Sequence, residues 1–481
     1  MRRAFAFASV EQFIVAILGF VSVFVVARLL TPEEIGISAI GVGIGTIVFT
    51  AKEFVSSEFL IQQRTLTRAD VGTAVTLAGV VNLAVAAVLW IASGWVAQGY
   101  DQPGLGAFLE VMCLAALFET LTTPFQALLR REIAFALLAR VNIASAAVTA
   151  AVTILCASMG MSFMSIAWGQ MAGALVRAAC AVALRPDIVT AGMSFAGWRN
   201  VLSFGGVKGT TTIIDRIYEA MPQLILGRVM PVAAVGYYNR ANLLCGIPDR
   251  LMMSAVFSFT FPALAARIRA GGDAKSAYLQ AQSYISVLFC PAVAFVALIA
   301  GPLVRGALGA GWEAVTPIVR ILAMASVFWF PIIVTQPTLF ALGANRSALA
   351  ASLTGRGAGM LILGSASFLG LTALALSQFV AIPFYAFVSL RAVRRHLGFT
   401  WGEFGRVALH SGAVLACTFL GPVALIVASG AGLAFGMWQA LACAGLAFVG
   451  WLGGVILLRH PILTELNILS HHALGMVRKT A

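Results

Sequence analysis

The sequence predicts an all-α, polytopic membrane protein of about 14 transmembrane helices, in two parallel six-helix lobes with two extra C-terminal helices. The first reason is composition: of the 481 residues, 60% are hydrophobic and only 10% are charged, and the mean hydropathy is +0.96. Soluble domains have about 45–50% apolar and about 25% charged residues, so a soluble globular chain and a disordered chain are both excluded. The second reason is the length of the apolar runs, and the third is an internal repeat.

A helix that spans the bilayer needs about 20 mostly apolar residues, because the hydrocarbon core is about 30 Å thick and the helix rises about 1.5 Å per residue. The runs that meet this length lie at 9–29, 36–56, 72–97, 105–128, 135–157, 162–183, 203–226, 233–258, 279–300, 315–340, 347–367, 371–390, 410–429 and 436–457. The first run resembles a secretion signal, but Glu11 interrupts it and no small-residue cleavage site precedes Arg28, so we expect an uncleaved span. The seventh, eighth and eleventh runs contain ionisable residues, which makes them the weakest spans.

The Lys and Arg residues predict the orientation. The chain has 31 of them against 18 Asp and Glu residues, a net charge of +13. Most lie at the termini or at even-numbered connections, as Arg394 and Arg395 do, whereas the odd-numbered connections hold only Arg28, Arg228 and Arg305. By the positive-inside rule, both termini are expected in the cytoplasm. Topology thus accounts for the basic excess, and no nucleic-acid partner is expected.

The longest polar stretches also fall on the expected cytoplasmic side. They lie near 185–201, 263–278 and 391–408, and they mix Arg with aromatic residues such as Trp198 and Trp401. That mixture suits interfacial helices that rest on anionic lipid, so membrane lipids are expected contact partners. No connection is long enough to form a separate domain.

An internal repeat divides the chain. Residues 27–36 read ARLLTPEEIG and residues 227–236 read GRVMPVAAVG, with the same spacing from Arg to Gly and matched apolar positions. Each copy lies at the outer end of the first helix of a six-helix block, and an even number of spans per block makes the repeats parallel, as in some transporters. We therefore expect an N-terminal lobe at 1–195 and a C-terminal lobe at 196–395. An interfacial segment and helices 13 and 14 then occupy 396–481.

Three stretches resemble a known family. They are ARLLTPEEIG, the Asp215-Arg216 pair in a helix that opens with SFGG, and GRVMPVAAVGYYNRANLLCGIP followed by FPALAAR. With the helix layout, they are similar to the Wzx-type polysaccharide flippases of the multidrug/oligosaccharidyl-lipid/polysaccharide exporter superfamily. The resemblance implies a V-shaped pair of lobes around a central cavity. It also implies alternating-access transport of undecaprenyl-pyrophosphate-linked oligosaccharide across the bacterial inner membrane for exopolysaccharide, capsule or O-antigen synthesis, with a polysaccharide polymerase and chain-length proteins as partners.

The seventh run has the densest set of charges, and charges inside a membrane are site candidates because they are costly there. Lys208, Asp215 and Glu219 fall within about 60° of one another on a helix, and Arg216 lies at the edge of that sector. One interpretation is an ion network that holds helices together. The other is a cavity lining in which Lys208 and Arg216 attract phosphate, while Asp215 or Glu219 takes a proton and couples transport to an ion.

Further cations lie in the following runs. Arg240 follows the Gly236 and Tyr238 pattern of the resemblance and is expected in the cavity, whereas Asp249 and Arg250, directly after a predicted break at Pro248, are expected to anchor the inner helix end. Arg320 and Arg356 sit part of the way along their spans and add to a cationic lining. A pyrophosphate head cannot cross hydrocarbon, whereas arginine binds phosphate with paired donors, so a cationic path suits such a substrate.

The remaining motifs indicate structure rather than chemistry. Gly41, Gly43 and Gly45 resemble a phosphate loop, but they lie inside a span, where close helix packing explains them. The seven cysteines form no CxxC pair, and the five histidines show no zinc-ligand spacing, so we expect no metal, no cofactor and no disulfide framework.

These residues allow three functions to be compared. A lipid-linked oligosaccharide flippase fits best. A small-molecule or multidrug exporter of the same superfamily would need a negative lining for organic cations, which the excess of Arg opposes. A membrane polymerase, ligase or glycosyltransferase would need positioned acid and base groups, usually on a large external loop, and the external connections are short. We therefore expect a transporter and not an enzyme.

Overall fold

A computed structural model describes residues 2–55, 60, 67–190, 192–195, 198–250, 272–430, 432 and 435–464. The side chains of 2–9, 189, 200–208, 210 and 211 also lie outside that description. In the described part of the chain every regular element is a helix, which confirms the all-α prediction. The helices fall into two compact units, Met1–Asn239 and Arg240–Ala481, so each unit is considered by itself. The predicted domain boundaries near 195 and 395 stay predictions.

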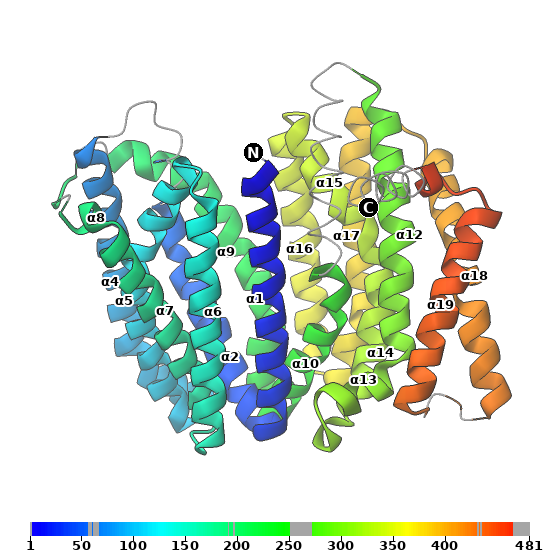
Figure 1. Ribbon diagram of the computed structural model, residues 1–481, viewed down its shortest axis with the longest axis horizontal. Helices are drawn as coiled ribbons and strands as arrows, with labels where there is room; N and C mark the ends of the chain where they lie inside the picture. Colours follow the sequence, from blue (N-terminus) through cyan, green and yellow to red (C-terminus); the bar gives the residue numbers. More distant parts are fainter. Residues whose placement is uncertain are drawn as a thin grey trace, which may run out of the picture. The chain divides into compact units, whose positions relative to one another are not determined.

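The first unit is a bundle of long helices (Figure 1). Its elements are α1 (Arg2–Leu29), α2 (Pro32–Phe49), η1 (Thr50–Phe54), α4 (Arg68–Gly99), α5 (Pro103–Arg131), α6 (Phe135–Ser158), α7 (Met164–Leu184), α8 (Pro186–Thr190), α9 (Trp198–Val229) and the first turns of α10 (Val232–Cys245). The sequence sets the start of α2, because the Thr31 hydroxyl accepts the Glu34 amide at 3.3 Å and the Glu34 carboxylate accepts the Thr31 amide at 2.7 Å. Pro32 occupies the first helical position, where its missing N–H costs nothing.

The second unit continues the helical pattern with shorter pieces among the long ones (Figure 1). Its elements are the end of α10, α12 (Ala274–Leu298), α13 (Ala300–Ala307), η2 (Ala310–Trp312), α14 (Val315–Ser326), η3 (Val327–Trp329), α15 (Phe330–Ala341), α16 (Asn345–Ser367), α17 (Leu371–Leu397), α18 (Trp401–Ser429) and α19 (Met437–Leu457). The predicted span at 315–340 is interrupted by the η3 turn, which ends two positions before Pro331. Proline cannot donate to the helical ladder, so the chain tightens there.

Eleven helices of the described chain are long and apolar enough to cross a membrane. They are Val10–Leu29, Pro32–Phe54, Arg68–Gly99, Pro103–Arg131, Phe135–Ser158, Met164–Leu184, Ala274–Leu298, Val315–Ala341, Leu371–Leu397, Trp401–Ser429 and Met437–Leu457. The three other predicted spans, at 203–226, 233–258 and 347–367, are those whose ionisable residues made them weak. The first and third are helical throughout as parts of α9 and α16, whereas the second begins as α10 and runs into 251–258, outside the described residues. The count of 14 stays a prediction.

The surface of both units shows that lipid is the expected solvent. Large apolar side chains face outward along the helices; Trp95 is 72% exposed and Trp438 is 84% exposed. Small and hydroxyl side chains such as Ser145 and Ser389 are instead fully buried between helices. This arrangement is typical of membrane helices, which pack through small residues and place apolar ones against acyl chains.

The two copies of the repeat meet inside the first unit. A Cβ added at Gly36, in the first turns of α2, would overlap the carbonyl oxygen of Val232, at the start of α10. A Cβ added at Gly236 would overlap the carbonyl oxygen of Pro32. The contacts are reciprocal because residues 32 and 232, and residues 36 and 236, occupy equivalent places in the two copies. Only glycine permits the two helix starts to cross this closely, which is the local reason for glycine at both positions.

Candidate functional site

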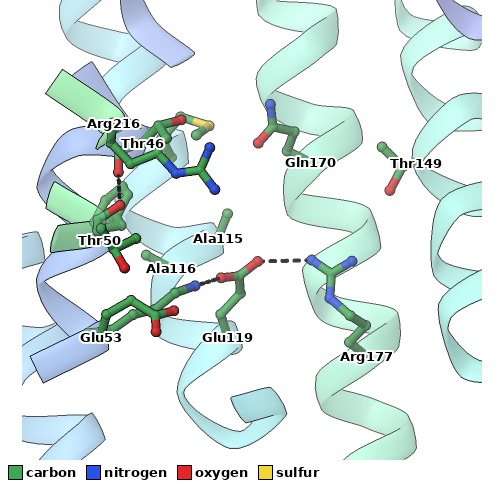
Figure 2. Close-up of a pocket in the computed structure, with 15 residues that line it drawn as sticks. Thr46, Thr50, Glu53, Ala115, Ala116, Glu119, Thr149, Gln170, Arg177 and Arg216 are labelled. Carbon is green, nitrogen blue, oxygen red and sulfur yellow. Dashed lines mark hydrogen bonds and ion pairs between the residues drawn. The ribbon is translucent and has the colours of Figure 1, made fainter. Parts of the chain in front are cut away.

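A cavity of about 520 Å³ lies within the first unit, between helices that the membrane is expected to surround. Its lining comes from α2 and η1, from the middle of α5, from α6 and α7, and from α9 (Figure 2). The lining includes the cations Lys52, Arg177 and Arg216 and the carboxylates Glu53 and Glu119. The cavity therefore combines a polar interior with an apolar bundle exterior, as a path for a polar group through a membrane requires.

Glu119 joins two cations at the centre of this lining. One carboxylate oxygen, Oε2, accepts from Lys52 Nζ at 2.5 Å, and the other, Oε1, accepts from Arg177 Nη2 at 3.0 Å (Figure 2). The three side chains come from η1, α5 and α7 and are 27%, 31% and 24% exposed, respectively, for Lys52, Glu119 and Arg177. The pairing is therefore accessible from the cavity while it links three helical elements.

The packing of α7 on α6 positions Arg177. Gly169, Gly173 and Arg177 follow one another at four-residue intervals and so share one face of α7. A Cβ at Gly169 would overlap the Thr153 hydroxyl, and one at Gly173 would overlap the Thr149 hydroxyl, so glycine allows the close approach. One turn further along, the buried Ser145 hydroxyl accepts from Arg177 Nη1 at 2.5 Å and donates to the Gly173 carbonyl oxygen at 3.0 Å. Arg177 is thus held by α6 independently of Glu119.

Arg216 reaches the same cavity from α9, on the other side from Arg177 (Figure 2). Its Nη1 donates to Glu219 Oε2 at 2.8 Å, one turn along the helix. Glu219 does not line the cavity, so the lining itself holds three cations against two carboxylates. Two planar guanidinium groups and one ammonium group can together bind an anion that carries several phosphate oxygens.

Of the site residues predicted on the seventh span, Arg216 lines the cavity, whereas Asp215 and Glu219 do not. Arg216 and Glu219 form the ion pair just described, and Asp215 is half-buried on the same helix. The Lys208 side chain lies outside the described residues. The roles given to these residues stay predictions.

The other predicted cations belong to the second unit. Arg240, on α10, is only 5% exposed, and its Nε has no hydrogen-bond partner among the described residues. Arg320, on α14, and Arg356, on α16, are half-buried. A buried guanidinium on a helix of this kind is costly and therefore a candidate for function, so these three cations also stay predictions.

Sequence reasoning missed Lys52, Glu119 and Arg177. The positive-inside rule treats Lys52 and Arg177 only as charges that orient the chain, and Glu119 is not among the predicted site residues. The signal was present, since Glu119 lies inside the fourth predicted span and Arg177 inside the sixth, and a charge within a span is a site candidate. In the part of the chain that the structure describes, no group of three or more His, Cys, Asp or Glu side chains is arranged to hold a metal ion.

These features define a polytopic membrane protein with a cation-lined cavity inside a helical bundle. A family model described as "Polysaccharide biosynthesis protein" matches residues 25–317, more than half of the chain. The chain belongs to this family.

Named relatives agree with the family. The chain is 20% identical over 329 residues to the lipopolysaccharide biosynthesis protein WzxC of Escherichia coli K12, and the aligned region covers 66% of this chain and 65% of that protein. It is 24% identical over 334 residues to the succinoglycan biosynthesis transport protein ExoT of Rhizobium meliloti, and the aligned region covers 68% of this chain and 66% of that protein. The matched region thus spans just under two thirds of either relative.

The solved structure of the lipid II flippase MurJ, in an inward closed conformation, has the same fold. The TM-score is 0.73 at 13% sequence identity, and the match covers 94% of this chain and 98% of that one. At so low an identity the likeness establishes the fold alone. The fold is therefore shared along nearly the whole chain.

Proposed function

We propose that the protein is a transporter that flips undecaprenyl-pyrophosphate-linked oligosaccharide across the bacterial inner membrane by alternating access. The observation that carries the proposal is the cavity of the first unit, where Lys52, Arg177 and Arg216 line a polar space among membrane helices. The prenyl tail of such a substrate can stay in the lipid, but its pyrophosphate head needs a polar path. The names of WzxC, ExoT and MurJ, which refer to polysaccharide synthesis, transport and lipid flipping, support the same substrate class.

The proposed orientation places this cavity toward the cytoplasm. With both termini cytoplasmic, the second, fourth and sixth spans end on that side, and they carry Lys52, Glu119 and Arg177 in their second halves. A substrate assembled in the inner leaflet would then meet the cations first. The predicted cations Lys208, Arg240, Arg320 and Arg356 would extend the positive path, and several moderate contacts permit release better than one tight site.

Proton coupling is a further part of the proposal. Asp215 and Glu219 lie on the helix that carries Arg216, and Glu219 is already paired with that arginine. A proton taken up by either carboxylate would free positive charge for the substrate, and the membrane potential supplies about 2.3 kcal/mol per charge per 100 mV. A polysaccharide polymerase and chain-length proteins are proposed partners of the assembled pathway.

The rival function of a multidrug exporter fits the cavity less well. An organic cation would need a carboxylate that is available to it, whereas Glu119 is held by two cations at 2.5 and 3.0 Å. The lining has more positive than negative side chains, which would repel a cationic drug.

Reconstitution tests the proposal directly. The purified protein is placed in liposomes that contain undecaprenyl-pyrophosphate-linked oligosaccharides on one leaflet, and an external lectin reports the sugar that reaches the other leaflet. We expect lectin-accessible sugar to rise in proteoliposomes and to stay at the level of protein-free liposomes when both Arg177 and Arg216 are replaced by Gln. No rise with any of several oligosaccharides, for protein that elutes as a single species, would contradict the flippase proposal.

A further inference from the structure

We propose that Glu119 is a displaceable internal counter-ion, whose carboxylate holds Lys52 and Arg177 until an anionic headgroup takes its place between them. The headgroup class, a diphosphate, is taken from the proposed function, so this inference deepens that function. The exchange itself concerns the three side chains of the first unit.

The bridge uses two donors that a diphosphate would also bind. Each oxygen of the Glu119 carboxylate accepts from a different cation, at 2.5 Å from Lys52 and 3.0 Å from Arg177. A diphosphate also presents separated oxygens that accept from Lys and Arg, and it carries more charge than one carboxylate. The two anions therefore compete for the same donors.

Arg177 stays in place when Glu119 leaves. Arg177 Nη1 is bound to Ser145 Oγ at 2.5 Å, and this serine is completely buried between α6 and α7. Lys52 belongs to η1, which closes the end of α2. Because Arg177 keeps its bond to Ser145, the exchange needs a movement of the Glu119 side chain, while Lys52 turns to the incoming anion from a backbone that η1 holds.

The exchange also explains how a transporter with a cationic cavity can complete the return step of its cycle without bound substrate. Three cations in a low-dielectric site repel one another and are costly to enclose within a membrane. Glu119 is paired with Lys52 and Arg177 at the same time, and Glu219 is paired with the third cation, Arg216, at 2.8 Å. The internal carboxylates thus replace the substrate's charge during the return step, so the conformational change never encloses an unpaired set of cations.

The first test measures binding of inorganic pyrophosphate to the purified full chain by isothermal titration calorimetry. Glu119→Gln removes the competing anion, so we expect its dissociation constant for pyrophosphate to fall about tenfold. Glu132→Gln is the matched control, because Glu132 follows the same helix and pairs with Arg185 at 2.6 Å but does not line the cavity. This control is expected to bind pyrophosphate as the unaltered chain does.

Glu53→Gln distinguishes displacement of Glu119 from a general change in the electrostatic potential of the cavity. It removes one negative charge from the same lining and leaves the Glu119 bridge intact. We expect a smaller gain in affinity than for Glu119→Gln. Equal gains in the two variants, or unchanged or weaker binding in Glu119→Gln, would overturn the proposal.

A second variant keeps the test decisive if Glu119→Gln does not fold. Glu119→Asp keeps the charge on a side chain that is one methylene shorter, which weakens the bridge to Lys52 and Arg177, so we expect it to bind pyrophosphate more tightly than the unaltered chain does. Affinity equal to that of the unaltered chain would overturn the proposal.

Transport then separates the two proposals. In liposomes, Glu119→Gln is expected to bind pyrophosphate more tightly yet transport lipid-linked oligosaccharide more slowly, because the return step lacks its counter-ion. Tighter pyrophosphate binding without any transport by the unaltered chain would contradict the flippase proposal and leave the exchange standing. Transport by the unaltered chain with no change in pyrophosphate affinity for Glu119→Gln would do the reverse.

Discussion

Two cavities of similar chemistry, one in each unit, use their carboxylates differently. The cavity of the first unit, about 520 Å³, places Glu119 between Lys52 and Arg177. The cavity of the second unit, about 600 Å³, is lined by the starts of α12 and α18 and pairs Lys275 with Glu403 at 2.6 Å. Both contain an accessible ion pair, so ion pairing alone does not tell which cavity binds a substrate.

The second cavity's carboxylates are committed to helix starts. Glu403 Oε2 accepts the Thr400 amide at 2.6 Å and completes a capping box, while Asp273 Oδ1 accepts the Ser276 amide at 3.1 Å at the start of α12. Removing either carboxylate leaves backbone donors without a partner. The oxygens of Glu119 instead accept from two side-chain cations, which a bound anion could satisfy equally well. A carboxylate can be exchanged for substrate only where no helix start depends on it.

The largest expected effect is a difference in transport rate between variants of the first cavity and variants of the second. Arg177→Gln removes a charge-assisted donor from the first cavity, and such a bond is worth about 1.5–3 kcal/mol, so initial transport should fall tenfold or more. Lys275→Gln removes a cation from the second cavity and is expected to transport lipid-linked oligosaccharide at close to the unaltered rate. Both rates come from the lectin assay in liposomes at equal protein density. Equal losses in the two variants would show that the second cavity also handles substrate.

Ser145→Ala sharpens the same comparison with a smaller effect. It deletes the hydroxyl that holds Arg177 Nη1 at 2.5 Å, while Arg177 keeps its charge and its bond to Glu119. A misplaced but charged arginine should lower transport by several-fold, about 1 kcal/mol in the barrier. Ser145→Thr, which restores a hydroxyl, should recover part of the rate if the site accepts the extra methyl group. A rate for Ser145→Ala equal to that of the unaltered chain would mean that Arg177 does not depend on this contact.

In the second cavity the corresponding effect is expected on stability. Thr400→Ala removes the hydroxyl that accepts the Glu403 amide at 3.2 Å, and loss of such a cap costs about 1 kcal/mol. The thermal midpoint in detergent should fall, while pyrophosphate affinity stays the same. Thr400→Ser, which keeps the cap, is the control and should melt close to the unaltered chain. A change in pyrophosphate affinity without a change in midpoint would reverse the roles assigned to the cavities.

The sequence predicted the helices better than it predicted the partners of their charges. Apolar runs set the spans because each run is a local property. The contact between the two copies of the repeat at Gly36 and Gly236 was not predicted, because it depends on how α2 and α10 pack. Arg216 and Glu219 could be paired from helical periodicity, since they are one turn apart.

The Glu119 bridge could not be predicted in the same way. Its two contacts join residues 67 and 58 positions apart, so they depend on how η1, α5 and α7 pack. The positive-inside rule accounts for Lys52 and Arg177 without any role in a cavity. A cation near the end of a span satisfies that rule whether or not it also faces a cavity, and only the packing distinguishes the two cases.

The smallest expected effect concerns His460, which lies beside the second cavity and follows α19. Its Nδ1 accepts the Ile462 amide at 3.3 Å, so Nε2 carries the proton and donates to Ser283 Oγ at 3.0 Å. Burial, with a smaller contribution from the neighbouring His410, lowers the pKa of His460 to about 4, whereas the unfolded value is about 6.5. The unfolded chain therefore binds this proton first, and the stability contributed by neutral His460 is complete above pH 6.5 and is lost as the pH falls toward 4.

Between pH 7.5 and 6 this loss should be below about 1 kcal/mol, seen as a modest fall in the thermal midpoint in detergent. His460→Gln can donate to Ser283 but cannot titrate, so its midpoint should depend less on pH over this interval. The first cavity has no histidine in its lining, so pyrophosphate affinity should show no matching change that depends on residue 460. If His460→Gln altered the pH dependence of pyrophosphate binding as well as that of the midpoint, the two cavities would be coupled. The division between an exchangeable ion pair in one unit and a structural ion pair in the other would then have to be abandoned.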